Sequence, residues 1–121
     1  MIELFSQKGG ANMDLVKVFR NTAANIMSYA KRAVYYARKD KHSAAAMYVT
    51  LAHSEMAVLK SLYYAHFQEL TNSGIDEFIS AFYAFVDETT ESCADGTSYQ
   101  HSYIAFNKLK AKYESSALAP R

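Results

Sequence analysis

Helix-breaking residues, cysteine and long apolar runs are all scarce in this sequence of 121 residues. Proline occurs once, at Pro120, and glycine only four times, so little interrupts long helices along the chain. The single cysteine, Cys93, excludes an intramolecular disulfide and a zinc site built from several cysteines. No stretch approaches the roughly 18 uncharged apolar residues of a membrane-spanning helix, so we expect no contact with a membrane.

The amino-terminal residues 1–10 lack the basic start and the apolar run of a secretory signal peptide. Together with the single thiol, this favours a cytoplasmic protein. The chain is rich in apolar surface, because 50% of its residues are hydrophobic and 14% are aromatic. These proportions predict one globular domain with a substantial core.

Charge is divided unevenly along the chain. Residues 8–60 hold nine Lys or Arg against three acids, whereas residues 61–107 hold seven acids and no Lys or Arg. This division suits two hairpins that attract each other, or contact between the basic half of one copy and the acidic half of another. Basic residues in the first half alternate with tyrosines, but the acidic second half argues against a nucleic-acid partner. The basic residues concerned are Lys31, Arg32, Arg38, Lys39 and Lys41.

Apolar residues recur every three or four positions in four segments, which predicts four helices over about 13–39, 43–70, 74–92 and 98–115. Ser73 with Asp76, and Thr97 with Gln100, have the form of capping boxes for the last two helices. The short connections predict an all-α, antiparallel, up-down-up-down four-helix bundle. We expect residues 1–12 to form an arm, 13–116 the bundle and 117–121 a frayed tail.

The second predicted helix has more apolar surface than one buried face requires. Its core positions are Tyr48, Ala52, Met56, Leu59, Tyr63 and Leu70, and four further apolar residues lie beside them. Exposed tyrosines also favour protein–protein contact. We therefore predict an interface that contains Met47, Leu51, Val58, Leu62, Tyr35 and Tyr64.

The segment SYAKRAVYYARKDKHSAAAMYVTLAHSEMAVLKSLY combines a tyrosine- and alanine-rich helix, a charged turn and a second helix with the motif LAHSEM. Over residues 21–70 the chain resembles the ferritin-like and rubrerythrin-like superfamily, and within it the small members encoded by Firmicutes and their prophages. The resemblance implies a four-helix bundle of phage origin. In that superfamily, Glu-x-x-His pairs and further carboxylates hold two iron ions.

The residues of that di-iron site are mostly missing here. Glu55 matches the family carboxylate, but Val58 stands where the histidine belongs, and residues 21–25 contain no acid. The resemblance therefore implies a degenerate member without the di-iron site. We predict no metal and no cofactor. If a metal does bind, the candidates are His66 and Glu69, which are three residues apart and would need partners such as Glu91 or His101.

We predict a non-catalytic bundle that acts through protein–protein contact or self-assembly, and no enzyme activity. One alternative is a metal-dependent ferritin-like oxidoreductase, or a metal-binding protein, with a rearranged site. Another is an inhibitor or adaptor that binds a host protein through its acidic half. Metal analysis of the purified protein separates the first alternative from the prediction.

Overall fold

A computed structural model describes residues 10–70, 73–95 and 99–119, except the side chains of residues 10–14, Glu69 and Asp95. These residues form α2 (Gly10–Arg38), α3 (His42–Ala65), the one-turn α4 (Phe67–Leu70), α5 (Ile75–Asp95) and α6 (Gln100–Ser115). The described ranges contain no strand. The prediction of an all-α fold is therefore confirmed.

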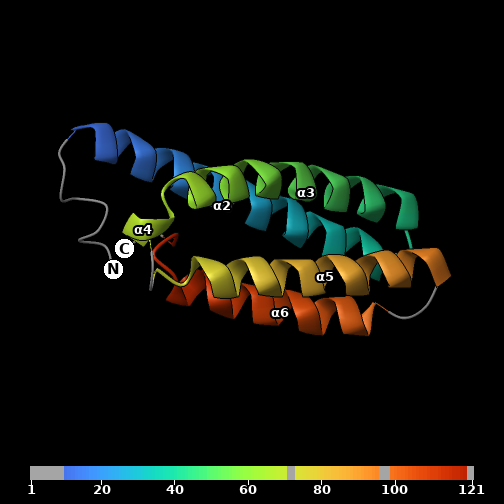
Figure 1. The fold of residues 1–121 in the computed structure, drawn as a ribbon. Helices are drawn as coiled ribbons and strands as arrows, with labels where there is room; N and C mark the ends of the chain where they lie inside the picture. Colours follow the sequence, from blue (N-terminus) through green and yellow to red (C-terminus); the bar gives the residue numbers. More distant parts are fainter. Residues whose placement is uncertain (1–9, 71–72, 96–98, 120–121) are drawn as a thin grey trace.

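The four long helices form two antiparallel hairpins that lie side by side (Figure 1). α2 packs most extensively on α3, and α5 on α6, while α3 also contacts α5 and α2 contacts α6. This arrangement confirms the predicted four-helix bundle. Residues 1–9 of the predicted arm lie outside the described residues, and α2 already begins at Gly10, three residues before the expected start.

The predicted apolar faces of α2, α3 and α5 form the core. Small alanines on α2 and α3 let these two helices approach closely, and the rings of α5 fill the centre. In α3, Val49 is buried, whereas the predicted Tyr48 is half-buried and stacks on Tyr36 at a ring-centroid distance of 5.5 Å. The side chains with no exposed surface include Phe19, Ala23, Ile26, Ala30, Ala33, Ala52, Met56, Leu59, Phe78, Phe82 and Phe85.

The buried face of α6 differs from the hydrophobic pattern at one position. The spacing of apolar residues predicts a core face of Tyr99, Tyr103, Phe106, Leu109 and Tyr113. Leu109 is buried as predicted, but Tyr103 is 49% exposed, and Ser102 and Ala105 are buried beside Leu109. Ser102 and Thr89 of α5 share a buried hydrogen bond of 2.5 Å between their hydroxyl oxygens. Because each hydroxyl satisfies the other, two polar side chains occupy an interior position that the hydrophobic pattern assigned to an aromatic ring.

α3 ends at Ala65, five residues before the predicted helix end. The backbone N–H of His66 is shared between the carbonyls of Leu62 and Tyr63 at 3.2 Å each, and α4 follows as a separate turn. At the start of α5, the Ser73 hydroxyl accepts a hydrogen bond from the Ile75 N–H at 3.4 Å rather than from Asp76. Thr97 of the second predicted capping box lies outside the described residues.

The carboxy-terminal segment 116–119 packs onto the bundle beside the turn before α5 (Figure 1). We expected fraying from residue 117, but Ala117, Leu118 and Ala119 are 1%, 0% and 5% exposed. The Ala117 N–H donates to the Ser73 carbonyl at 2.8 Å. Leu118 enters the apolar core, so burial holds the segment in place.

Candidate interaction surfaces

The outer surface of α3 carries large apolar side chains that no other described element covers. Met47, Leu51 and Val58 are 51%, 38% and 46% exposed, and Leu62 is partly buried. At 100° per residue these four side chains lie within a sector of about 60°. We call them the α3 ridge.

The four side chains of the α3 ridge are uncharged, but Glu55 borders the ridge, because at 100° per residue it lies about 20° from Leu62 around the helix. Glu55 lies toward α2, where the Asn25 amide donates a hydrogen bond to its carboxylate at 2.7 Å. Lys60 lies toward α5, and its ammonium is 3.3 Å from the Tyr83 hydroxyl. The inner face of α3 is occupied by the core, and of the four ridge residues Leu62 packs against that core, whereas Met47, Leu51 and Val58 are exposed.

The two tyrosines of the predicted interface do not join the α3 ridge. Tyr64 is 61% exposed but lies about 130° around α3 from the centre of the ridge. Tyr35 is 51% exposed and belongs to α2, where it lines a cavity shared with α6. The structure therefore distributes the six predicted residues over three separate surfaces.

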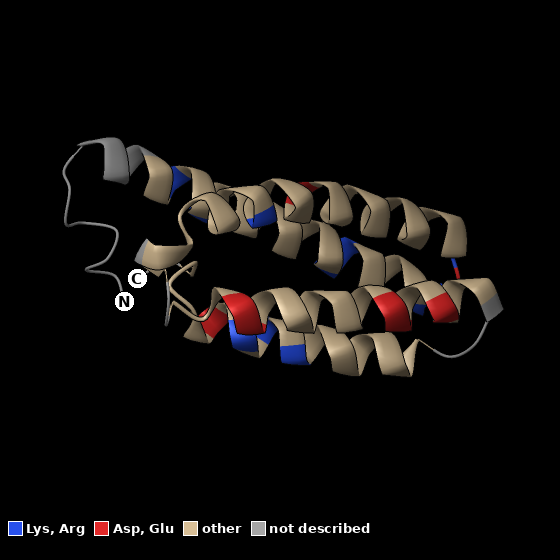
Figure 2. Cartoon of the chain, in the orientation of Figure 1, with Lys and Arg blue, Asp and Glu red and all other residues tan. Residues whose placement is uncertain are grey.

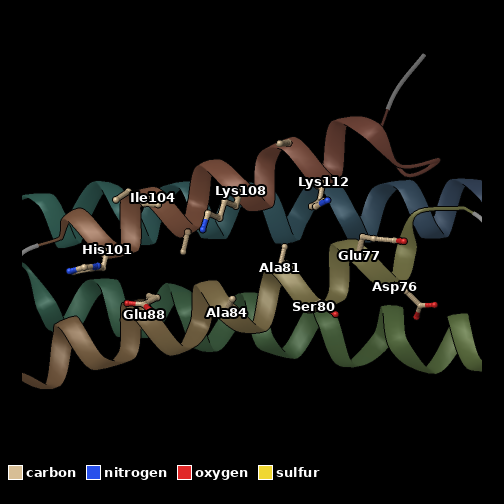
Figure 3. Close-up of a pocket in the computed structure, with 12 residues that line it drawn as sticks. Asp76, Glu77, Ser80, Ala81, Ala84, Glu88, His101, Ile104, Lys108 and Lys112 are labelled. Carbon is tan, nitrogen blue, oxygen red and sulfur yellow. The ribbon is translucent and has the colours of Figure 1, made fainter.

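A groove of about 820 Å³ runs along the outer face of α5 and α6 (Figure 3). We call it the α5–α6 groove. Its floor consists mostly of small side chains. Its borders carry charges of opposite sign, with acids on α5 and bases on α6 (Figure 2). The floor includes Ser80, Ala81, Ala84, Ala105 and Ala111, and the borders include Asp76, Glu77, Glu88, Lys108 and Lys112.

The charges that border this groove are not neutralised across it. None of these five acids and lysines makes an ion pair with another residue that the structure describes. His101 and Ile104 also line the groove, and Ile104 is 51% exposed. The groove therefore combines small side chains, which leave room for another molecule, with charged side chains that form no ion pair within the described chain.

The predicted metal candidates no longer share one helix. His66 lies in the turn after α3, and Glu69 belongs to α4, with a side chain outside the described residues. Among the side chains that are described, no group of three or more His, Cys, Asp or Glu residues is placed to hold a metal ion. Glu55 accepts the Asn25 hydrogen bond that joins α3 to α2.

Cys93 is not placed for nucleophilic catalysis with His101. The thiol lines a cavity between α3 and α5 together with His42, whereas His101 lines the α5–α6 groove. Burial raises the pKa of the Cys93 thiol, which disfavours the reactive thiolate. Cys93 and His101 therefore line different cavities and do not form a thiol–imidazole pair.

No helix in the described part of the chain is both long and apolar enough to cross a membrane. Comparisons with protein-family models, with characterised proteins and with solved structures found no match.

Proposed function

We propose that this protein is a non-catalytic helical bundle that acts through protein–protein contact, with the α3 ridge as its contact surface. The supporting observation is the uncharged sector of α3 that exposes Met47, Leu51 and Val58 while the opposite face of the same helix is fully used by the core. Contiguous apolar surface of this kind typically marks a site of interaction.

A second copy of the chain is the partner that the surfaces favour. The α3 ridge is convex and apolar, and the α5–α6 groove is concave with a floor of small residues. Ridges of one helix pack into grooves between others by the rules that govern helix packing within proteins. The ridge and the groove are different surfaces, so this contact is heterologous and leads to rings or open chains of subunits.

The charge distribution supports the same pairing. Among the bases of α2, Arg32 lies against α3, with its guanidinium carbon 5.8 Å from the centre of the Tyr48 ring, whereas α5, at the groove, carries six acids and no base (Figure 2). Insertion of the ridge brings the basic hairpin of one copy toward the acidic helix of the next. Such complementarity raises the association rate and selects the orientation.

The size of the surface predicts a weak association. The α3 ridge runs from Met47 to Leu62, or about 22 Å along the helix, and a strip one helix wide over this length is small for a specific interface. We expect dissociation constants in the micromolar range, where concentration controls assembly.

Sedimentation velocity on a concentration series tests the proposal, with Val58→Lys as the variant and Val18→Lys as the matched control. The two valines are 46% and 44% exposed, and both lie within helices, on α3 and α2. We expect the wild type and Val18→Lys to form oligomers as concentration rises, and Val58→Lys to remain monomeric. Circular dichroism shows that all three are folded.

Equal association of all three proteins would contradict the role of the ridge. A wild type that stays monomeric at tens of micromolar in low salt would contradict self-association. Stoichiometric iron, manganese or zinc that is lost in His66→Ala would instead support the metal-dependent alternative. The resemblance of residues 21–70 to ferritin-like proteins is the reason for keeping this alternative.

A further inference from the structure

α2 and α6 enclose a cavity of about 440 Å³ that is separate from both surfaces described above. Lys31, Val34, Tyr35 and Arg38 line it from α2, at a spacing that places them on one face of the helix. From the other side come Tyr99, immediately before α6, and Tyr103 and Phe106 within it. The volume falls within the range of small-ligand sites.

The aromatic walls of this cavity are both exposed and anchored. Tyr35 and Tyr103, from opposite walls, are 51% and 49% exposed, so their rings are accessible to a ligand. Tyr103 packs edge-on against Tyr99 at 6.3 Å between ring centroids. Phe106 packs against the buried Phe85 at 6.0 Å, which fixes this wall to the core.

Tyr35 is held in place on its own helix. Its ring contacts Tyr36 edge-on at 5.2 Å, and Tyr36 in turn stacks on Tyr48 with an interplanar angle of 1°. The Lys39 ammonium lies 4.7 Å from the centre of the Tyr35 ring. Lys39 also lowers the pKa of the Tyr35 hydroxyl, which indicates a positive local potential.

The cavity carries positive charge without compensation. Lys31 and Arg38 are exposed, and neither makes an ion pair with a described residue. None of the described lining residues bears a carboxylate. Three of the acids of α5, namely Asp76, Glu77 and Glu88, line the α5–α6 groove and do not line this cavity.

We infer that this cavity binds a nucleotide, either free or within a single-stranded nucleic acid, by stacking its base on Tyr35 and Tyr103 and its phosphate on Lys31 or Arg38. Stacked aromatic side chains beside a line of cations are how proteins bind single strands irrespective of sequence. Lys31 and Arg38 are seven residues apart, or about 10.5 Å along α2, so they flank the position of the base. An acidic peptide would satisfy the cations but would leave the exposed rings without a planar partner.

Binding is measured by fluorescence anisotropy at low salt with a labelled deoxyadenylate oligomer of about 12 nucleotides, a length within the site size of single-strand binders. Adenosine monophosphate, added as a competitor, is the second probe, and a polyglutamate peptide is the third. The variants are Tyr103→Ala and Lys31→Glu. Their matched controls are Tyr64→Ala, an exposed tyrosine of α3, and Lys17→Glu, an exposed lysine on α2 about 21 Å from Lys31 along the axis.

We expect Tyr103→Ala to weaken binding by about 5- to 150-fold, the range for loss of one stacked base, and Lys31→Glu to weaken it at least tenfold. Both controls should stay within about threefold of the wild type, because Tyr64 and Lys17 do not line the cavity. Competition by adenosine monophosphate identifies a site for free nucleotide, whereas binding of the oligomer alone identifies a strand. Either result supports the inference.

The inference is overturned by any of three results. The first is that neither adenosine monophosphate nor the oligomer binds at millimolar concentration. The second is that polyglutamate competes as strongly as the oligomer, which shows a general anion surface. The third is that the control variants lose as much affinity as the test variants, which shows that binding is spread over the basic hairpin. Because Tyr103 belongs neither to the α3 ridge nor to the α5–α6 groove, its variant separates this inference from self-association.

Discussion

Two leucines of α3 show how burial, rather than residue type, sets the contribution of a side chain to stability. Leu59 has no exposed surface and lies at the centre of the core, whereas Leu51 is 38% exposed on the α3 ridge. Both occur on the same helix with the same intrinsic preference for helix. Truncation of each therefore isolates the effect of position.

Leu59→Ala, and likewise Phe82→Ala at another fully buried position, should lower the free energy of unfolding by about 2–5 kcal/mol. Leu51→Ala should lower it by less than about 1 kcal/mol, because solvent already contacts that side chain. Urea unfolding of the monomer, followed by circular dichroism, measures both. Equal losses for Leu51→Ala and Leu59→Ala would mean that α3 is rotated relative to the core.

The hydroxyl of Tyr63 makes the free energy of unfolding depend on pH in the alkaline range. Burial, and after it the Asp76 carboxylate, raises the pKa of its hydroxyl from 10.0 to about 12. The unfolded chain therefore loses this proton at a lower pH than the folded chain. The contribution of the neutral hydroxyl is complete below pH 10 and is lost as pH rises from 10 toward 12.

We expect the stability difference between the wild type and Tyr63→Phe to shift in favour of Tyr63→Phe as pH rises from 10 toward 12. The other tyrosines titrate in both proteins, so their contributions cancel in the difference. Urea unfolding at several pH values in this window measures the effect. A difference that is constant across the window would show that the Tyr63 hydroxyl titrates alike in the folded and unfolded chains.

At the scale of elements, the turn before α5 and the carboxy-terminal segment depend on each other. Gly74 has a positive φ of 83°, and a Cβ atom there would lie 3.0 Å from the Ser116 Cα and 3.1 Å from its Cβ. Only glycine fits both the conformation and the space. The local sequence predicts that a helix begins near Gly74. The residue that limits the space at Gly74 is Ser116, which lies 42 positions further along the chain.

Gly74→Ala should lower the free energy of unfolding by about 1–3 kcal/mol, through backbone strain and displacement of segment 116–119. Leu118→Ala should also destabilise, because Leu118 is fully buried. If the two act through one contact, the double variant loses less stability than the sum of the single ones. Additive losses would show that the segment stays docked when Gly74 is replaced.

At the scale of the molecule, the distribution of charge has a consequence for assembly. The first hairpin is basic and α5 is acidic (Figure 2), yet within one chain the acids and lysines that border the α5–α6 groove form no ion pairs with described residues. Contact of the ridge with this groove in another copy brings charges of opposite sign together. Exposed charges of this kind are screened by salt.

Self-association should therefore weaken as salt rises beyond the concentration at which the Debye length is about 8 Å. Light scattering at constant protein concentration, over a salt series, measures the change. An association held by the apolar ridge alone should not weaken as salt rises, because screening acts on charges and not on the burial of apolar surface. Association that strengthens with salt would show that apolar burial dominates and that the charges of α5 lie outside the contact.

The sequence by itself determined the four long helices, the buried faces of α2, α3 and α5 and the excess apolar surface on α3. Each of these features follows from local periodicity, because one helix displays its own residues at 3.6 per turn whatever its neighbours are. The unusual breadth of apolar residues around α3 was visible for the same reason. The absence of a histidine three residues after Glu55 is likewise visible in the local sequence.

The tertiary structure alone decided the burial of Ser102 in place of Tyr103 on α6, the docking of segment 116–119 and the cavity between α2 and α6. Ser102 is buried only because Thr89 lies opposite on α5, and Leu118 is buried only because the turn at Gly74 leaves room. Tyr35 and Tyr103 are 68 positions apart and face one cavity only because α2 and α6 are adjacent. Contacts between distant residues depend on which helices become neighbours, and periodicity within one helix carries no information about that choice.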